Sequence, residues 1–119
     1  MPTGYQIQDQ ERPYYLTLQV VEWVDIFTRK IYRNIIVDSL NYCVNHKHLE
    51  IYGYVIMSNH IHLIAKSNSG DLSGTLRDFK SFTSKEILKA IEEGNESREK
   101  WMLHIFKNAA IKHQRNSDY

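Results

Sequence analysis

The sequence contains a single cysteine, Cys43, so no disulfide bond can form within the chain. A chain without disulfides fits a reducing compartment, and we expect a cytoplasmic protein in which Cys43 is packed rather than reactive. No apolar run approaches the roughly 20 residues that a membrane-spanning helix needs, and the first residues lack the pattern of a signal peptide. We therefore expect no membrane association.

The sequence also has almost no net charge, because 15 Lys and Arg residues face 14 Asp and Glu residues, which gives +1. A nucleic-acid partner would therefore have to be bound by local basic clusters rather than by the bulk charge. No internal repeat or low-complexity segment divides the 119 residues. The length predicts one small domain, residues 1–119, with one core between a sheet and two or three helices.

Three segments show strand patterns. In residues 14–24, Leu16 and Leu18 alternate with Thr17 and Gln19, so one face is apolar and the other suits solvent or a polar ligand. Residues 49–56 and 59–66 form two further strands. Only a few residues separate these two, which predicts an antiparallel hairpin.

Three segments show helical patterns, namely residues 28–45, 72–93 and 97–112. Thr28 is the expected N-cap of the first helix, and Ser69 or Asp71 that of the second. The first helix carries an apolar stripe at helical spacing, made of Tyr32, Ile36, Leu40 and Cys43. The order strand, helix, strand, strand, helix predicts an α+β sandwich with an antiparallel sheet and an added C-terminal helix.

Two histidines stand one residue apart in an apolar, β-branched run. Residues i and i+2 of a strand project from the same face, so His60 and His62 would point together to one side of the sheet, opposite to Ile61. Two neighbouring imidazoles can share one divalent cation. A bare His-x-His pattern also occurs on exposed strand faces without any such role, so the pattern alone leaves both interpretations open.

The context of the pair favours the metal interpretation. A strand, a Ser-Asn turn and the segment His60-Ile61-His62-Leu63-Ile64 resemble the HUH signature, in which U is a bulky apolar residue. Residues 54–64 look like the signature segment of the small single-tyrosine HUH transposases, which include insertion-sequence transposases and their REP-associated relatives. Residues 14–27 and 71–85 are similar to the same family, so the resemblance covers most of the chain.

The resemblance implies a ferredoxin-like fold with helices on one face of the sheet. It implies a transposase that works as a homodimer on single-stranded DNA containing hairpins. His60 and His62 would be the catalytic pair that holds Mg²⁺ or Mn²⁺, and the cation would polarise the scissile phosphate. Imidazole ligands suit Mn²⁺ better than Mg²⁺, but phosphate oxygens and waters in the shell leave either ion open.

In the implied reaction a tyrosine hydroxyl attacks a phosphodiester, forms a 5′-phosphotyrosine and releases a 3′-hydroxyl that can later reverse the step. The family carries this tyrosine on a helix C-terminal to the sheet, in a pattern near Tyr-Ile-x-x-Asn-Pro. No such pattern occurs in this sequence, and Tyr119 is a candidate only by its distance from His62. We expect a C-terminally shortened transposase domain; the alternative is a DNA-binding module or decayed transposase without cleavage activity.

Cations and hydroxyls share one face of the helix predicted over residues 72–93. Such a face either contacts phosphates or is simply solvated, and the family resemblance of this segment favours DNA contact. The predicted DNA-binding residues are Arg77, Lys80, Ser84 and Lys85. The basic start of the preceding helix, with Arg29, Lys30 and Arg33, leaves the same two interpretations open.

Other residues have less specific signals. Trp23 and Phe27 either stack on bases or cap a core, and core capping is favoured. His46 and His48 have metal-like spacing in a polar turn, where we expect them to be exposed. A histidine-triad nucleotide hydrolase would need a third histidine where Ile64 stands, and a cupin-like metal site would need many short strands, so both alternatives are disfavoured.

Overall fold

The computed structural model describes residues 9–20, 24–94 and 98–116, with side chains described as far as Asn108. The elements follow the order β1 (Tyr14–Gln19), η2 (Ile26–Thr28), α1 (Lys30–His46), β2 (Leu49–Ile56), β3 (His60–Ser67), α2 (Leu72–Glu93) and α3 (Glu99–Asn116). The three strands form an antiparallel sheet in the order β1-β3-β2. The predicted α+β fold with an added C-terminal helix is confirmed.

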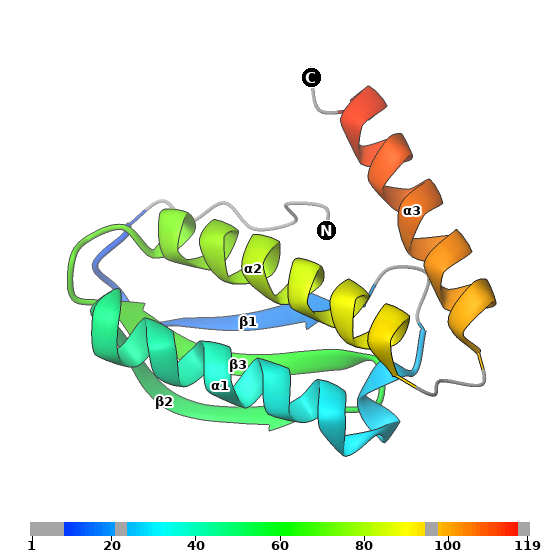
Figure 1. The fold of residues 1–119 in the computed structure, drawn as a ribbon. Helices are drawn as coiled ribbons and strands as arrows, with labels where there is room; N and C mark the ends of the chain where they lie inside the picture. Colours follow the sequence, from blue (N-terminus) through cyan, green and yellow to red (C-terminus); the bar gives the residue numbers. More distant parts are fainter. Residues whose placement is uncertain (1–8, 21–23, 95–97, 117–119) are drawn as a thin grey trace.

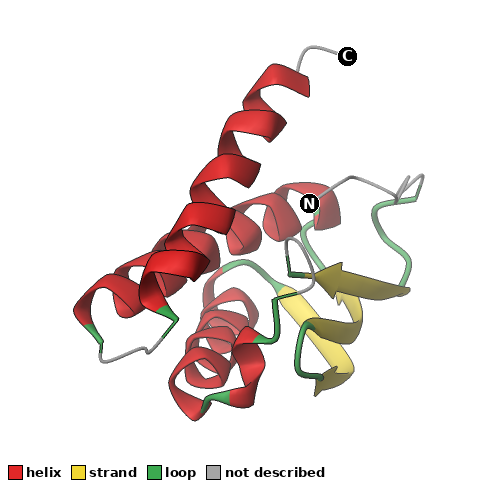
Figure 2. Cartoon of the chain, turned by 90° about the vertical axis from the view of Figure 1, so that its right-hand side faces the viewer, coloured by secondary structure: helices red, strands yellow, loops and turns green. Residues whose placement is uncertain are grey.

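Two helices cover one face of this sheet. α1 and α2 lie side by side across it (Figure 1), whereas no described element covers the other face, as the view along the layers shows (Figure 2). α3 contacts α2 and then extends away from the two layers in both views. The sheet therefore has a covered face, which forms the core, and an open face.

The central strand β3 decides which residues face each side. Its Ile61, Leu63 and Ala65 are at most 3% exposed and pack under the helices. Leu63 lies opposite Leu16 of β1 in the strand register, and Leu16 is also completely buried. Because successive strand residues point to opposite faces, this buried row turns His60, His62 and Ile64 to the open face.

The outer strand β2 contains a bulge. Ile51 pairs with Ala65 and Gly53 with Ile64, so the residue between them, Tyr52, has no partner in the register. Beyond this extra residue Val55 lies opposite His62 and is 53% exposed, while Ile56 lies opposite Ile61 and packs against the core.

α1 carries the predicted apolar stripe: Tyr32, Ile36, Leu40 and Cys43 are all buried. The predicted cap Thr28 is wrong, because Thr28 ends the short 3-10 helix η2 and α1 begins at Lys30 after Arg29. Arg33 Nη1 donates to the carbonyl oxygens of Phe27 at 2.8 Å and Thr28 at 3.1 Å. Its charge therefore stabilises the end of η2.

α2 begins where the sequence predicts. Asp71 Oδ1 accepts a hydrogen bond from the backbone N–H of Gly74 at 3.0 Å, which confirms Asp71 as the N-cap. The buried face of this helix consists of Leu72, Gly74, Thr75, Leu76, Phe79, Thr83 and Ile91. Such a cap contributes about 1 kcal/mol to the stability of a helix.

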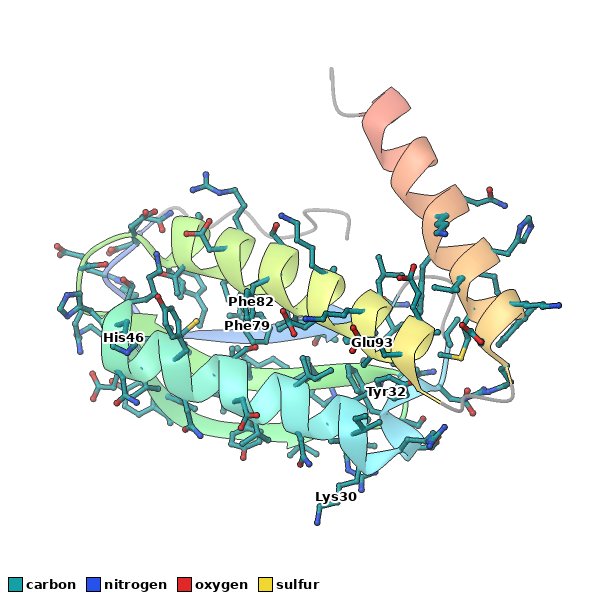
Figure 3. All side chains as sticks on the ribbon, in the orientation of Figure 1. Lys30, Tyr32, His46, Phe79, Phe82 and Glu93 are labelled. Carbon is teal, nitrogen blue, oxygen red and sulfur yellow. The ribbon has the colours of Figure 1, made fainter. Side chains whose placement is uncertain are left out.

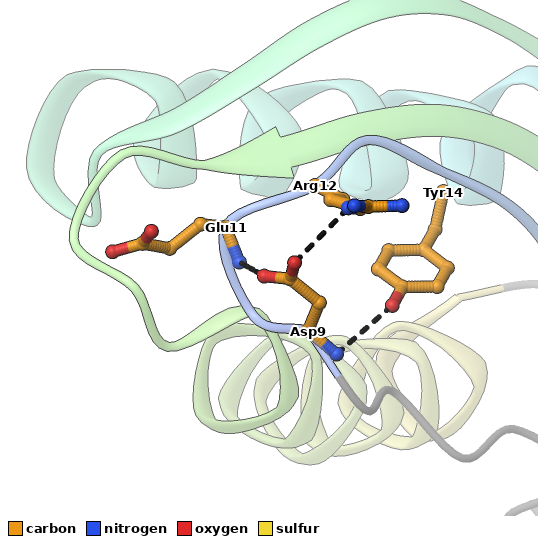
Figure 4. A network of polar contacts seen from close by, with 4 residues as sticks. All are labelled: Asp9, Glu11, Arg12 and Tyr14. Atoms are coloured by element: carbon orange, nitrogen blue, oxygen red, sulfur yellow. Dashed lines mark hydrogen bonds and ion pairs between the residues drawn. The ribbon is translucent and has the colours of Figure 1, made fainter.

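The segment before β1 is fixed by a local network (Figure 4). The Asp9 carboxylate accepts a hydrogen bond from the backbone N–H of Glu11 at 2.9 Å and lies 3.0 Å from Arg12 Nε. The backbone N–H of Asp9 donates to the hydroxyl of Tyr14 at 3.1 Å. This contact keeps Tyr14 on the helical side and leaves its neighbour Tyr15, which is 60% exposed, on the open face.

The first strand is shorter than the predicted residues 14–24, since it ends at Gln19. Phe27 is buried in the core, which confirms core capping over base stacking, and Trp23 lies outside the described residues. α3 starts beside an ion pair of Arg98 with Asp25, whose hydrogen bond holds the pKa of Asp25 below its usual value. Within the described residues, no helix has the length and apolar character needed to span a bilayer.

Replacing Leu63 with Ala is expected to lower the free energy of unfolding by about 2–5 kcal/mol, because the side chain is fully buried at the centre of the sheet. The neighbouring Ile64→Ala serves as a matched control, because Ile64 is 40% exposed on the open face. That change should cost less than about 1 kcal/mol. Urea denaturation of both variants measures the difference, and equal costs would contradict the assignment of the two faces.

Candidate metal centre on the open sheet face

The two histidines of β3 meet on the open face of the sheet. His60 Nε2 lies 3.1 Å from His62 Nε2, with the two rings edge to face at 82° and their centroids 4.7 Å apart. Both side chains are partly exposed. The prediction that the two side chains point to the same face of the sheet is thus confirmed.

Each imidazole has a polar partner at its other nitrogen. Asn59 Oδ1 lies 2.8 Å from His60 Nδ1, and the Tyr15 hydroxyl lies 2.8 Å from His62 Nδ1. Thr17 Oγ1 is a weaker second partner of His62 Nδ1 at 3.4 Å. Tyr15 and Thr17 come from β1, whose register places Thr17 directly opposite His62.

These outer partners favour one protonation pattern. The amide oxygen of Asn59 only accepts, so His60 Nδ1 must carry the proton and its Nε2 keeps a free lone pair. The 3.1 Å contact between the two Nε2 atoms is then a hydrogen bond in which His62 Nε2–H donates to His60, and the Tyr15 hydroxyl donates to His62 Nδ1. For one cation to bind both Nε2 atoms, His62 has to take the other tautomer, in which its Nδ1–H donates to the Tyr15 hydroxyl. Outer hydrogen bonds of this kind orient metal-binding imidazoles in proteins.

The spacing of the two Nε2 atoms also suits a shared cation. Nitrogens bound to one first-row metal at about 2.0–2.1 Å each are roughly 3 Å apart when their bonds are near a right angle. The observed 3.1 Å agrees with this value. No group of three or more His, Cys, Asp and Glu side chains able to hold a metal occurs among the described residues, so the remaining ligands would have to be other oxygens.

The turn before β3 is held by backbone hydrogen bonds. The N–H of Met57 donates to the His60 carbonyl at 2.8 Å, and the N–H of Val20 donates to the Asn59 carbonyl at 2.9 Å. The N–H of Phe27 donates to the Ser58 carbonyl, also at 2.9 Å. The turn is therefore closed on itself and tied to Val20 after β1 and to η2, and this fixes the backbone of Asn59 beside His60.

Exposed apolar side chains surround the imidazoles. Tyr15, Val55 and Ile64 are 60%, 53% and 40% exposed. They adjoin His62 across β1, across β2 and along β3 respectively. Apolar side chains gathered around polar ones in this way can serve as a binding surface. The Tyr15 ring also lies 5.4 Å from the His62 ring, between centroids.

The predicted DNA-binding residues are not brought together with the histidines. Arg77, Lys80, Ser84 and Lys85 belong to α2, which packs on the covered face, whereas the imidazoles lie on the open one. Arg77 Nε is 3.6 Å from Asp78 Oδ1, and partial burial lowers the pKa of Lys80. One phosphate cannot contact both groups, so a DNA role for α2 stays a prediction about a more distant part of the strand.

The remaining candidates fall outside the site. His46 and His48 are exposed as predicted, and the His46 ring stacks on Tyr42 with centroids 4.6 Å apart. Cys43 is buried, which agrees with a packing role, and burial raises the pKa of its thiol. Tyr119 lies outside the described residues. Tyr15 is a site residue that the sequence did not predict, and its place beside Thr17 on the polar face of the first strand was the available signal.

Comparison with known families now supplies the class of protein. The family model described as "Transposase IS200 like" matches residues 14–109, which include the whole sheet, α1, α2 and the beginning of α3. The chain therefore belongs to the IS200-like transposase family. Searches of curated proteins and of solved structures gave no significant match.

Removing the Tyr15 hydroxyl tests the hydrogen bond at His62. In Tyr15→Phe the Nδ1 of His62 keeps only the long contact to Thr17, so we expect its tautomer to become mixed, while Asn59 still holds that of His60. Long-range ¹H–¹⁵N spectra of the imidazoles measure this. Tyr14→Phe is the matched control, because Tyr14 contacts Asp9 and neither histidine. Unchanged His62 signals in Tyr15→Phe would contradict the contact.

Proposed function

We propose that this transposase domain binds single-stranded, hairpin-containing DNA and cleaves and rejoins it in a metal-dependent reaction through a phosphotyrosine intermediate. The observation that carries the proposal is the geometry of the histidine pair. Both Nδ1 atoms have protein partners, and both Nε2 atoms meet on an open, partly apolar sheet face.

In this proposal His60 and His62 hold one Mg²⁺ or Mn²⁺ ion. When bound, the cation supplies Lewis-acid polarisation and orientation of a phosphodiester. Asn59 holds His60 in the tautomer that presents Nε2, and the Tyr15 hydroxyl can accept from His62 Nδ1–H when the ion is bound. The backbone hydrogen bonds of residues 57–59 keep this arrangement rigid, which a metal centre requires for its geometry.

The nucleophile is a tyrosine by family resemblance, and we assign it to no residue. Tyr15 is near the site, but its hydroxyl is engaged with His62 Nδ1, so we give it a positioning role. The other described tyrosines are Tyr14, Tyr32, Tyr42, Tyr52 and Tyr54, and no hydrogen bond or ring contact joins them to His60 or His62.

The open face suits an unpaired strand better than a duplex. Exposed Tyr15, Val55 and Ile64 beside the histidines offer apolar surface to bases that are not stacked in a helix. The homodimer expected from the family is also part of the proposal. Among the described residues, β1 and β2 each pair only with β3, so each has one edge free for pairing across a two-fold axis.

Replacing both His60 and His62 with Ala should abolish Mn²⁺ binding and leave the fold intact, because both side chains lie on the open face. Calorimetric titration with Mn²⁺ measures the affinity, and circular dichroism checks the fold. His46→Ala with His48→Ala removes the same number of imidazoles from an exposed turn and should change nothing at the metal centre. Equal Mn²⁺ affinity in the wild type and the His60/His62 variant would contradict the metal centre.

Cleavage is tested with labelled single-stranded DNA containing a hairpin and Mn²⁺, on the chain extended by any C-terminal residues encoded after Tyr119, because the nucleophile is assigned to no residue of this chain. We expect a covalent protein–DNA adduct that resists denaturation, disappears in the His60/His62 double variant and resists conditions that hydrolyse phosphoserine. DNA binding without any adduct would contradict the cleavage proposal and favour the alternative of a DNA-binding module. Duplex DNA of the same sequence is the matched control, and it should give no adduct.

A further inference from the structure

Gly53 is a glycine in the interior of the strand β2. It lies opposite Ile64 in the register, and it is partly exposed on the open face of the sheet. A glycine in a strand interior weakens the strand, and it is found where a bulge needs a left-handed residue or where another molecule approaches the backbone closely. The geometry around Gly53 distinguishes these two reasons.

The bulge of β2 does not require a glycine at this position. Tyr52 is the extra residue of the bulge. Among the described glycines only Gly70 has a positive φ, so the backbone of Gly53 suits other residues as well. A Cβ added at Gly53 would meet no described atom within 4 Å beyond its two chain neighbours. Neither backbone conformation nor packing therefore excludes a larger residue here, and close approach of another molecule is the reason that remains.

The space above Gly53 is open, unlike the space on the other side of the sheet. On the covered face, core side chains such as Tyr32 and Phe79 fill the layer between the helices and the sheet (Figure 3). On the open face no described element lies over the strands (Figure 2). The missing side chain therefore leaves a shallow depression in the surface of β2 above Gly53, which we call the Gly53 notch.

Apolar side chains border the Gly53 notch. Tyr15, Ile64 and Gly53 are successive partners across the sheet, and both side chains of this row are exposed. Val55, also exposed, follows two residues after Gly53 on the same face. A flat ring can therefore lie on Ile64 and extend over the notch, where no side chain obstructs it.

This row is the neighbour of the histidine pair. Ile64 follows His62 by two residues, which is roughly 6.6 Å along a strand. The Tyr15 side chain joins the two rows, because its hydroxyl lies 2.8 Å from His62 Nδ1 and its ring centroid 5.4 Å from that of His62. A phosphodiester held by the histidines carries a nucleoside on each side, so the base of one of them comes to lie over this row.

We propose that Tyr15, Ile64 and the Gly53 notch form a subsite for one unpaired nucleobase beside the phosphodiester at the histidine pair. The base lies with its face on Ile64 and with its far edge over the notch. Because every base has such a face, the subsite selects an unpaired base over a paired one rather than one base type over another. This inference rests on the proposed function, since the phosphodiester places the base.

Filling the notch tests the subsite. Gly53→Ala and Gly53→Val should keep or raise the melting temperature, because the added atoms meet open space and glycine weakens a strand. Affinity for a labelled, hairpin-containing single strand with Mn²⁺, measured by fluorescence anisotropy, should fall in Gly53→Ala and fall further, at least roughly fivefold, in Gly53→Val. Affinity that stays the same or rises in Gly53→Val would overturn the subsite.

The matched control is Tyr54→Val. It places the same side chain at the next position of β2, opposite the buried Leu63 and thus on the other face of the sheet. Strand affinity should not change in this variant. An equal loss of affinity in Tyr54→Val and Gly53→Val would mean that the notch itself has no role, and this result would overturn the subsite.

Strands with one abasic nucleotide, moved step by step through the unpaired part, identify the bound base. One abasic position should weaken binding to the wild type at least roughly fivefold, and the same position should have little effect in Gly53→Val, because both changes remove the same contact. Losses that multiply in the combination, or no sensitive position at all, would overturn the subsite.

The His60/His62 double variant separates this inference from the proposed function. If it binds the strand with Mn²⁺ as tightly as the wild type does, the phosphodiester does not lie at the histidines, and both proposals are overturned. Binding that depends on the histidines, but neither on Gly53 nor on any single base, would overturn the subsite alone and leave the proposed function intact.

Discussion

The burial of one side of β3 is the constraint on which the rest of the structure depends. Ile61, Leu63 and Ala65 form a nearly solvent-free row under α1 and α2. Because successive residues of a strand point to opposite faces, burying this row turns the intervening histidines to the other face of the sheet. The packing of the core therefore puts both histidines on the open face, and Asn59 and Tyr15 then orient the two imidazoles there.

The same constraint explains why much of the fold could be predicted from the sequence. The periodicity of residues 49–56 and 60–67 is local, and so is the stripe of α1, so neighbouring residues sufficed to predict them. The facing histidines followed from spacing alone. The cap at Asp71 was also predictable, because its side chain bonds only three residues further on.

What could not be predicted depends on contacts between distant segments. The hydrogen bond from Tyr15 to His62 joins residues 47 positions apart, and it requires the β1–β3 register. Arg33 shifted the start of α1 by bonding two carbonyls of η2, which no helix-cap pattern signals. The separation of the α2 cations from the histidines arises from the order of the layers.

The bulge in β2 has a consequence for how related chains should be aligned. Before Tyr52 the odd-numbered residues of β2 point inward, and after it the even-numbered ones do, since Ile51 and Ile56 both pack on the core. A homologue that lacks this single residue would keep Val55 and Ile56 in the same environments, because the strand would then alternate regularly from Ile51 to Ile56 in the same register. An alignment that places the gap after Ile56 instead would shift residues 53–56 by one position and assign each aligned side chain to the wrong face of the sheet.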